Sequence, residues 1–232
     1  LAITVSGART GIAAGAVPDG GMLLSLERMS RMCGLRTGPC GEFRVRCEAG
    51  VLLSDLQRAV RSATFADSAS WDADSRACLE QMKKHRLFYP PDPTETSAAI
   101  GGTVACNASG AHTFRYGATR QYVTWLRVVL ADGTCLEVER GTCRADADGR
   151  FKLKSANGRE RQGQIPTYRW PQTKNSAGYY AAPGMDLIDL FIGSEGTLGI
   201  IVEVEVHLVS APETNSAAVV FLPDEPAALE LT

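Results

Sequence analysis

Glycine is concentrated in three short segments of this 232-residue chain, and their placement constrains the fold more than any other feature. The segments cover residues 7–21, 101–117 and 193–199. Glycine is required where the backbone adopts a positive φ or where a ligand lies directly against the main chain. A strand that runs into a glycine-rich turn can also point successive N–H groups at a phosphate, which forms an anion nest. The first segment fits such a nest, although by itself a surface turn explains it better.

None of the three segments is a common nucleotide-binding motif. Gly7, Gly11 and Gly15 stand four residues apart, unlike the Gly-x-Gly-x-x-Gly spacing of dinucleotide-binding folds, and no P-loop Gly-Lys-Ser/Thr follows them. The second segment follows Pro-Pro-Asp-Pro and Ala-Ala-Ile, and its small residues permit a flat ring system to lie against the main chain. The third segment, with the sequence Ile-Gly-Ser-Glu-Gly-Thr-Leu-Gly-Ile-Ile, predicts a compact turn before a strand.

Composition and charge exclude several classes of protein. The formal net charge is −2, which argues against a broad nucleic-acid or anionic-membrane surface. The chain is 44% hydrophobic and can bury a substantial core. No run approaches the roughly 18 apolar residues of a membrane helix. The seven cysteines contain no pair at the two-residue spacing of zinc or redox motifs, and the three histidines lie far apart. We therefore expect no metal site and a reducing, cytoplasmic setting.

Hydrophobic periodicity predicts more strands than helices. Strands are expected over residues 2–5, 22–26, 43–48, 122–130, 134–139 and 200–208. Residues 43–48 and 200–208 alternate between apolar and charged side chains, which predicts half-buried strands and places Glu205 in solvent. Asp132-Gly133 is typical of a type I′ hairpin turn.

The expected helices are few and short. Ser54 and Gln57 have the spacing of a capping box at the start of one helix, and a second is expected over residues 74–85. Hairpin-connected strands with short helices indicate an α+β fold rather than a doubly wound parallel sheet.

Residues 140–170 differ in composition from the rest of the chain. They contain eight basic and three acidic residues, an excess of five positive charges. Asn157-Gly158 is expected to turn a hairpin there. An exposed insertion explains the segment best, and a docking surface for an acidic partner is the alternative.

In their order and spacing these motifs resemble one family. Val-Ser-Gly-Ala-Arg-Thr-Gly, Pro-Asp-Pro, Ile-Gly-Gly, Tyr-Gly and the third glycine segment occur in the same order in FAD-linked oxidases of the vanillyl-alcohol-oxidase type. Glycolate oxidase, D-lactate dehydrogenase and D-2-hydroxyglutarate dehydrogenase share this FAD domain. The resemblance covers residues 1–212 and implies an α+β FAD-binding domain of the PCMH type. It further implies two α+β subdomains, of which the first is incomplete.

The resemblance also implies which residues contact FAD. The first glycine loop would donate backbone N–H groups to the pyrophosphate. The proline-rich segment and the Gly-Gly turn would pass along the isoalloxazine ring and the ribityl chain, and the third segment would close over the adenosine. The expected cofactor-binding residues are Ser6, Gly7, Ala8, Arg9, Thr10, Gly11, Pro91, Asp92, Ala98, Gly101, Gly102, Asn107, Ser109, Gly110, Tyr116, Gly117, Glu195, Gly196 and Ile200.

Departures from the family's pattern affect the expected chemistry. Covalently flavinylated relatives carry a histidine where this chain has Arg9, so FAD is expected to bind non-covalently. Residues 213–232 are expected to start a cap domain, with a strand over residues 217–222 and a helix capped by Asp224. Catalytic residues of the hydroxy-acid members lie largely in that cap, so none is assigned here, and this chain alone is expected not to turn over substrate. His112 is either a catalytic group near the flavin or a satisfied loop histidine.

The function implied by the resemblance is FAD-dependent oxidation of a 2-hydroxy acid of the D-lactate, glycolate or D-2-hydroxyglutarate class. The electron acceptor would be a protein or a quinone, with no nucleic acid and no transmembrane segment involved. The setting would be cytoplasmic, with peripheral attachment to a membrane as an alternative. Two other functions stay open: a reductase similar to that acting on UDP-N-acetylenolpyruvoylglucosamine, and a flavin-binding module without turnover.

Overall fold

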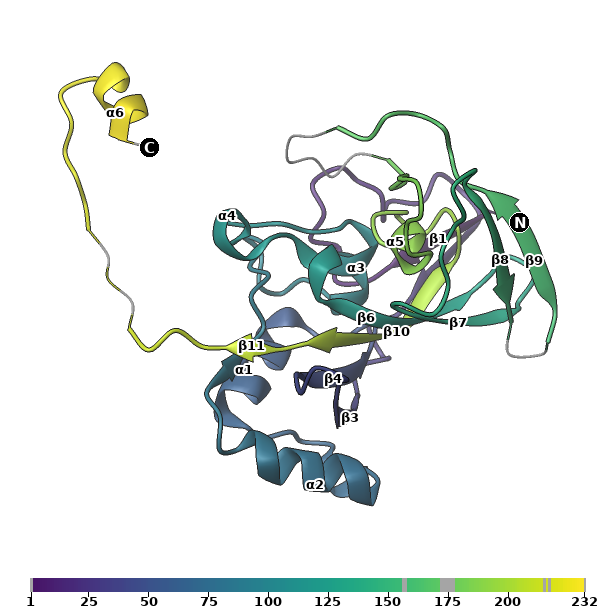
Figure 1. The fold of residues 1–232 in the computed structure, drawn as a ribbon, viewed down its shortest axis with the longest axis horizontal. Helices are drawn as coiled ribbons and strands as arrows, with labels where there is room; N and C mark the ends of the chain where they lie inside the picture. Colours follow the sequence, from purple (N-terminus) through teal and green to yellow (C-terminus); the bar gives the residue numbers. More distant parts are fainter. Residues whose placement is uncertain (1, 156–157, 172–177, 215, 217, 232) are drawn as a thin grey trace.

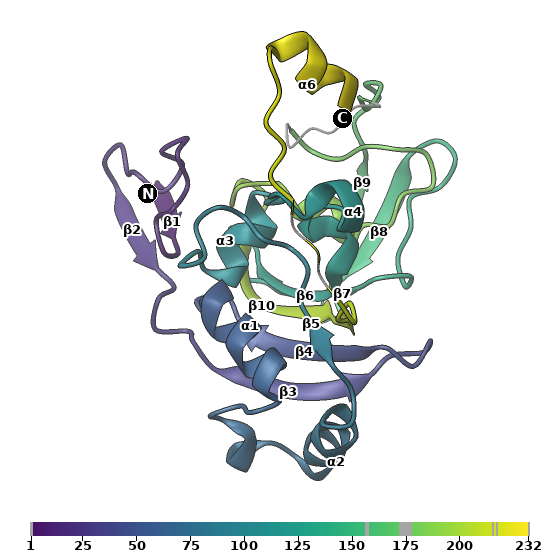
Figure 2. The ribbon, with the colours of Figure 1, turned by 90° about the vertical axis from the view of Figure 1, so that its left-hand side faces the viewer.

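The computed structural model describes residues 2–155, 158–171, 178–214, 216 and 218–231. Its centre is a five-stranded antiparallel sheet in the order β3–β4–β10–β6–β7 (Figures 1 and 2). These strands are β3 (Met32–Thr37), β4 (Phe43–Glu48), β6 (Val123–Val129), β7 (Cys135–Glu139) and β10 (Ile200–His207). Strand β10 therefore lies between strands from the first and second halves of the chain, and it joins the two halves into one sheet.

Shorter elements surround this sheet, and together they confirm the expected α+β class. Strands β1 (Ile3–Ser6) and β2 (Met22–Ser25) form a parallel pair, β5 (Leu87–Phe88) pairs with β11 (Val209–Ser210), and β8 (Arg150–Lys154) pairs with β9 (Glu160–Gln164). The helices are α1 (Leu53–Ser62), α2 (Ala73–Met82), α3 (Ile100–Ala105), α4 (Thr113–Tyr116), α5 (Ile188–Phe191) and α6 (Glu225–Leu231). Two 3₁₀ turns, η1 (Ser68–Ser70) and η2 (Thr119–Tyr122), complete the set.

The apolar face of the central sheet forms the core. Val45 of β4 and the neighbouring Val206 of β10 are completely buried there. Leu56 of α1 and Ile100 of α3 belong to the same cluster, and α3 packs against β10. Because α3 carries the Gly-Gly pair of the second glycine segment, the core fixes the position of that segment.

The opposite face of the sheet is charged, and here the expectation that Glu205 lies in solvent is wrong. Its side chain is only 1% exposed. Arg36 donates to both carboxylate oxygens at 2.6 and 2.7 Å, and Thr124 donates to one at 2.8 Å. Arg44 and Arg46 add ion-pair contacts at 3.7 and 3.5 Å. The charged side chains of neighbouring strands therefore cover one another, and these strands are more than half buried.

The expected capping box is also wrong. Helix α1 begins after Leu52, and no side chain caps it. The amide of Gln57 instead donates to the carbonyl oxygen of Pro91 at 3.3 Å, which ties α1 to the proline-rich segment. Helix α2 is capped by the preceding residue, Asp72, whose carboxylate accepts a hydrogen bond from the Ser75 N–H at 2.6 Å.

The β6–β7 hairpin is confirmed, but its turn is not type I′. A type I′ turn needs positive φ at both central residues, and Gly133 has a φ of 77° while Asp132 is not among the positive-φ residues. The N–H of Leu130 donates to the carbonyl of Thr134, which encloses a three-residue loop with glycine at its end. This arrangement is typical of a type I turn followed by a bulge.

The basic segment forms the β8–β9 hairpin that was expected, although Asn157 of its turn lies outside the described residues. Leu153 and Ile165 are buried, so one side of the hairpin contributes to the core.

Of the two elements expected at the C-terminal end, a strand and a helix, only the helix is confirmed. Residues 218–222 form no strand, and residue 217 lies outside the described part of the chain. Asp224 accepts a hydrogen bond from the Ala227 N–H at 3.0 Å and so caps α6, which stands apart from the rest of the fold in Figure 1. Among the described residues, no helix combines the length and the apolar character needed to cross a bilayer.

Candidate functional site

The three glycine segments meet around β1 and α3, although at least 186 positions separate Gly7 from the third segment. A side chain on Gly7 would place its Cβ 3.1 Å from the Cβ of Ala99, the residue before α3. At the other end of α3, the N–H of Glu195 donates to the carbonyl of Ala105 at 2.9 Å. The third segment also approaches β1, because a Cβ on Gly196 would lie 3.9 Å from Cγ2 of Val5. The segments thus form one continuous backbone surface.

The first loop, residues 7–21 between β1 and β2, offers unpaired backbone donors. Within the described part of the chain, no N–H group of residues 7–13 donates to a protein acceptor. Arg9 and Ala14 hold φ values of 58° and 59°, and such left-handed residues turn neighbouring N–H groups toward a common side. A run of unpaired amides in this conformation suits a diphosphate, so the loop fits FAD.

The glycine pair in α3 has two different environments. A Cβ on Gly101 would lie 2.5 Å from the Cβ of Ala49, and the Gly101 N–H donates to the Ala49 carbonyl at 2.7 Å. A Cβ on Gly102 would meet nothing within 4 Å. Gly101 therefore permits α3 to pack on the end of β4, whereas Gly102 leaves bare backbone beside open space, where a flat ring can lie.

The proline-rich segment is bound to the loop that follows α3. A Cβ on Gly110 would lie 1.9 Å from the Asp92 carbonyl oxygen, so only glycine fits this approach. The Asp92 carboxylate accepts the N–H of His112 at 2.9 Å. His112 Nδ1 lies 3.2 Å from the Pro90 carbonyl oxygen, which accepts but cannot donate. These contacts support the interpretation of His112 as a loop histidine whose Nδ1 carries the proton.

Arg120 was not expected from the sequence, although its hydrogen bonds connect the segments of the site. Arg120 donates to the carbonyls of Ile192, at 2.6 Å, and Asp189, just before the third glycine segment. Its own N–H donates at 3.0 Å to the side chain of Asn107, which has a φ of 45°. Its guanidinium carbon lies 4.6 Å from the centre of the Tyr180 ring. Burial lowers the pKa of the Arg120 guanidinium, and Asp189 opposes this effect. No sequence pattern relates Arg120 to Asp189, because 69 positions separate them.

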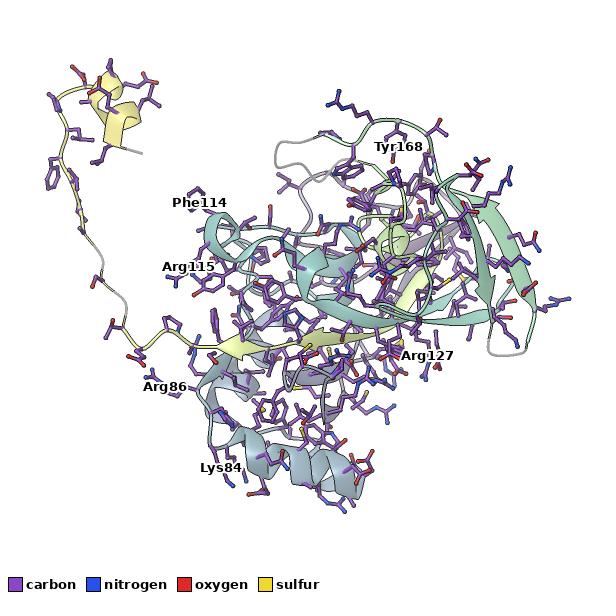
Figure 3. All side chains as sticks on the ribbon, in the orientation of Figure 1. Lys84, Arg86, Phe114, Arg115, Arg127 and Tyr168 are labelled. Carbon is purple, nitrogen blue, oxygen red and sulfur yellow. The ribbon has the colours of Figure 1, made fainter. Side chains whose placement is uncertain are left out.

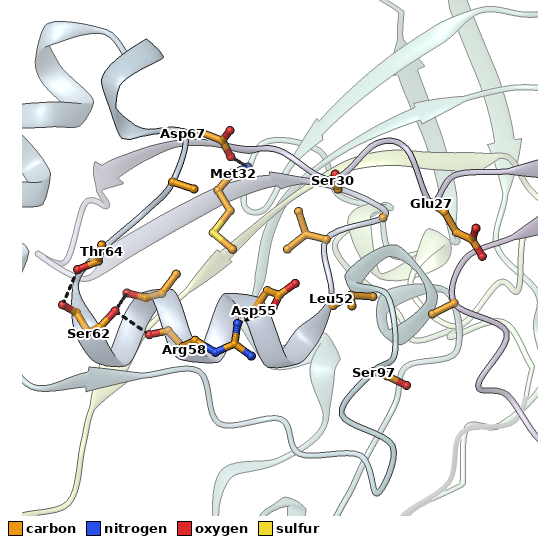
Figure 4. Close-up of a pocket in the computed structure, with 15 residues that line it drawn as sticks. Glu27, Ser30, Met32, Leu52, Asp55, Arg58, Ser62, Thr64, Asp67 and Ser97 are labelled. Carbon is orange, nitrogen blue, oxygen red and sulfur yellow. Dashed lines mark hydrogen bonds and ion pairs between the residues drawn. The ribbon is translucent and has the colours of Figure 1, made fainter.

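A groove of about 770 Å³ adjoins the first loop at Ala8 (Figure 4). Among the described residues that line it are the carboxylates of Glu27, Asp55 and Asp67. The guanidinium of Arg58, which also lines it, is paired with Asp55 at 2.8 Å. This excess of negative charge repels a diphosphate. The unpaired amides of the first loop are therefore the better phosphate site.

The expected site residues divide into two groups by position. The first group lies on β1, on α3 and on the turns beside them: Ser6, Gly7, Ala8, Arg9, Thr10, Gly11, Ala98, Gly101, Gly102, Asn107, Glu195 and Gly196. The second group lies on adjoining segments: Pro91, Asp92, Ser109, Gly110, Tyr116, Gly117 and Ile200. The Tyr116 ring packs edge-on against the Phe88 ring, with 5.3 Å between the ring centres, so Tyr116 already contacts another side chain of the protein. On the same short helix, Phe114 is fully exposed and extends away from the protein (Figure 3).

The first loop, with its unpaired amides, and the bare backbone at Gly102 together fit an FAD-binding domain. Residues 76–139 match the family described as FAD binding domain. The chain is similar to FAD-linked oxidases, and these matches support FAD as its cofactor.

Curated relatives cover nearly the whole chain. It is 32% identical to a D-lactate dehydrogenase of Anaerostipes hadrus over 92% of the chain and 32% of that protein. It is 30% identical to a D-2-hydroxyglutarate dehydrogenase of Xanthomonas citri pv. viticola, over 96% of the chain and 35% of the relative. It is also 30% identical to glycolate oxidase subunit GlcD of Bacillus subtilis, over 92% of the chain and 33% of that protein. The chain thus spans about a third of the length of these relatives.

A solved structure shares the fold. Alkyldihydroxyacetonephosphate synthase superposes with a TM-score of 0.54 and 16% identity, over 91% of this chain and 30% of that one. At this identity the match supports the PCMH-type fold and nothing about substrate.

Proposed function

We propose that this chain forms the flavin-binding part of an enzyme that oxidises a small 2-hydroxy acid of the D-lactate, glycolate or D-2-hydroxyglutarate class. The observation that carries the proposal is the meeting of the three glycine segments around β1 and α3. The names of the relatives support the substrate class. Residues 213–232, with α6, are part of the proposal as the start of a substrate-binding domain.

The residues of the chain have separate tasks in this proposal. The N–H groups of the first loop hold the diphosphate, and Gly102 leaves the space for the ring. The contacts of Arg120 to Asn107 and Ile192 hold the second and third glycine segments in register. Bound there, FAD would supply the hydride acceptor for oxidation of the substrate at its carbinol carbon.

We also propose that FAD is held without a covalent link at the first loop. Residues 6–16 contain no histidine, and the guanidinium of Arg9 is a poor nucleophile because it stays protonated. The electrons would leave to a protein or a quinone, which belongs to the same proposal.

Anaerobic visible spectroscopy of the gene product that contains this chain tests the proposal. The purified protein is expected to show flavin absorption that bleaches on addition of at least one of D-lactate, glycolate and D-2-hydroxyglutarate, with L-lactate as the stereochemical control. Flavin absorption that no 2-hydroxy acid bleaches would contradict the substrate class and favour a binding module. A protein that does not take up FAD would contradict the site itself.

A further inference from the structure

Arg9 occupies an unusual position in the first loop. Its φ of 58° lies in the left-handed region, which side-chain-bearing residues other than Asn and Asp rarely adopt. Such residues persist where the surrounding structure over-determines them, and they cluster at ligand sites. Arg9 therefore adds a cationic side chain to the same loop that carries the unpaired amides of residues 7–13.

Within the chain, this cation pairs with a carboxylate. Arg9 Nη2 lies 2.7 Å from Oε1 of Glu27, two residues beyond β2. The two side chains are 56% and 46% exposed. Exposed ion pairs are weak because water competes for both charges, so a stronger anion can displace the carboxylate.

A diphosphate is such an anion. It carries more negative charge than a carboxylate and accepts several hydrogen bonds from a guanidinium. The backbone amides of the loop would hold it beside Arg9. Glu27 and the diphosphate then compete for one guanidinium.

We propose that Glu27 is a competing counter-ion that sets the affinity of the first loop for diphosphate-containing nucleotides. The carboxylate holds Arg9 before binding, and the diphosphate takes over the guanidinium on binding. This inference rests on the proposed placement of the diphosphate at the first loop. The same exchange favours FAD and ADP over FMN and AMP, whose single phosphates offer fewer acceptors.

Affinity measurements on a double-mutant cycle test the exchange. Dissociation constants for FAD are measured by flavin fluorescence, and those for ADP by calorimetry, on the apo gene product and its variants. Glu27→Gln is expected to tighten FAD and ADP binding by roughly two- to five-fold, the range that loss of an exposed ion pair allows. Arg9→Gln, which keeps the side chain long but uncharged, is expected to weaken binding by roughly ten-fold or more.

The coupling between the two substitutions shows whether Glu27 acts on binding through Arg9. In the Arg9→Gln background, Glu27→Gln is expected to tighten binding less than it does in the wild type, because it then removes only the direct repulsion between the carboxylate and the diphosphate. Glu80→Gln is the matched control, because Glu80 forms an exposed ion pair with Lys83 on α2, away from the loop. Thermal unfolding of each apo variant shows that it is folded.

Each outcome separates this inference from the proposed function. Weaker or unchanged FAD binding by Glu27→Gln would overturn the competition, and so would an equal gain in the Arg9→Gln background. If the wild type binds FAD but Arg9→Gln binds it equally well, the diphosphate does not use Arg9, although the FAD site stands. If the wild type binds neither FAD nor ADP, both proposals fail.

Discussion

A methyl group added at Gly101 or at Gly102 separates packing from cofactor binding. The two glycines are neighbours in α3, and their Cβ positions have opposite surroundings. Gly102→Ala meets no atom within 4 Å, whereas Gly101→Ala places a carbon 2.5 Å from the Ala49 Cβ and 3.0 Å from its carbonyl oxygen.

The two substitutions are expected to change the free energy of unfolding in opposite directions. Alanine is better than glycine in a helix by about 1 kcal/mol, so Gly102→Ala should stabilise the apoprotein by up to that amount. Gly101→Ala gains the same amount, but its 2.5 Å approach to Ala49 adds overpacking in the upper part of the usual range, about 2–3 kcal/mol, against a neighbour that cannot rotate away. We expect a net loss of about 1–2 kcal/mol at Gly101, which lowers the melting temperature by roughly 2–8 °C.

The FAD affinity is expected to follow a different order. The larger Gly102→Val fills the space beside the bare backbone, so the apoprotein should fold while its affinity for FAD falls. Chemical denaturation of the apoproteins and flavin fluorescence titrations measure the two effects separately. Wild-type FAD affinity in Gly102→Val would refute the placement of the ring beside this residue. Unchanged stability in Gly101→Ala would refute the packing against Ala49.

Three further predictions follow from other parts of the structure. Acid precipitation should release FAD into the supernatant, because Arg9 stands where a linking histidine would be; flavin in the pellet would contradict a non-covalent site. Arg120→Ala should cost about 3 kcal/mol of unfolding free energy, because among the described residues it leaves Asp189, whose side chain is 12% exposed, with Arg140 alone as an ion-pair partner. Urea denaturation that shows no loss would contradict a stabilising role of Arg120. Burial lowers the pKa of His207 below its ordinary 6.5, so its contribution to stability is complete above pH 6.5 and is lost as the pH falls through the lowered pKa. His207→Gln should therefore flatten the acid side of the stability curve, and an unchanged slope there would contradict the burial.

The sequence predicted well those features that depend on local pattern. Alternating hydrophobicity located β4 and β10 of the central sheet, because the period of two in a strand is visible within a few residues, whereas β3 was not among the expected strands. The glycine strings predicted the backbone-lined site, because their order along the chain matched one family. The hairpin between β6 and β7 followed from Asp132 and Gly133, although the number of loop residues changed its turn type.

Features that depend on distant partners were not predictable from the sequence. Glu205 was expected in solvent because alternation treats the charged face of a strand as exposed. Its partner Arg36 stands 169 residues away in the sequence, and only the assembled sheet shows that it covers the carboxylate. In the same way, Gly101 and Gly102 are residues of the same type, and only the position of Ala49 in the folded chain shows which of them packing requires to be glycine.

Amide mapping by ¹H–¹⁵N NMR during titration of the apoprotein with FAD tests the central claim, the placement of the diphosphate and ring, most directly. The account predicts the largest shift changes at the N–H groups of residues 7–13, at Gly102 and at residues 193–197, with little change at Thr64 and Asp67 in the acidic groove. FAD binding with unchanged first-loop amides, or with its largest changes in the groove, would contradict the account.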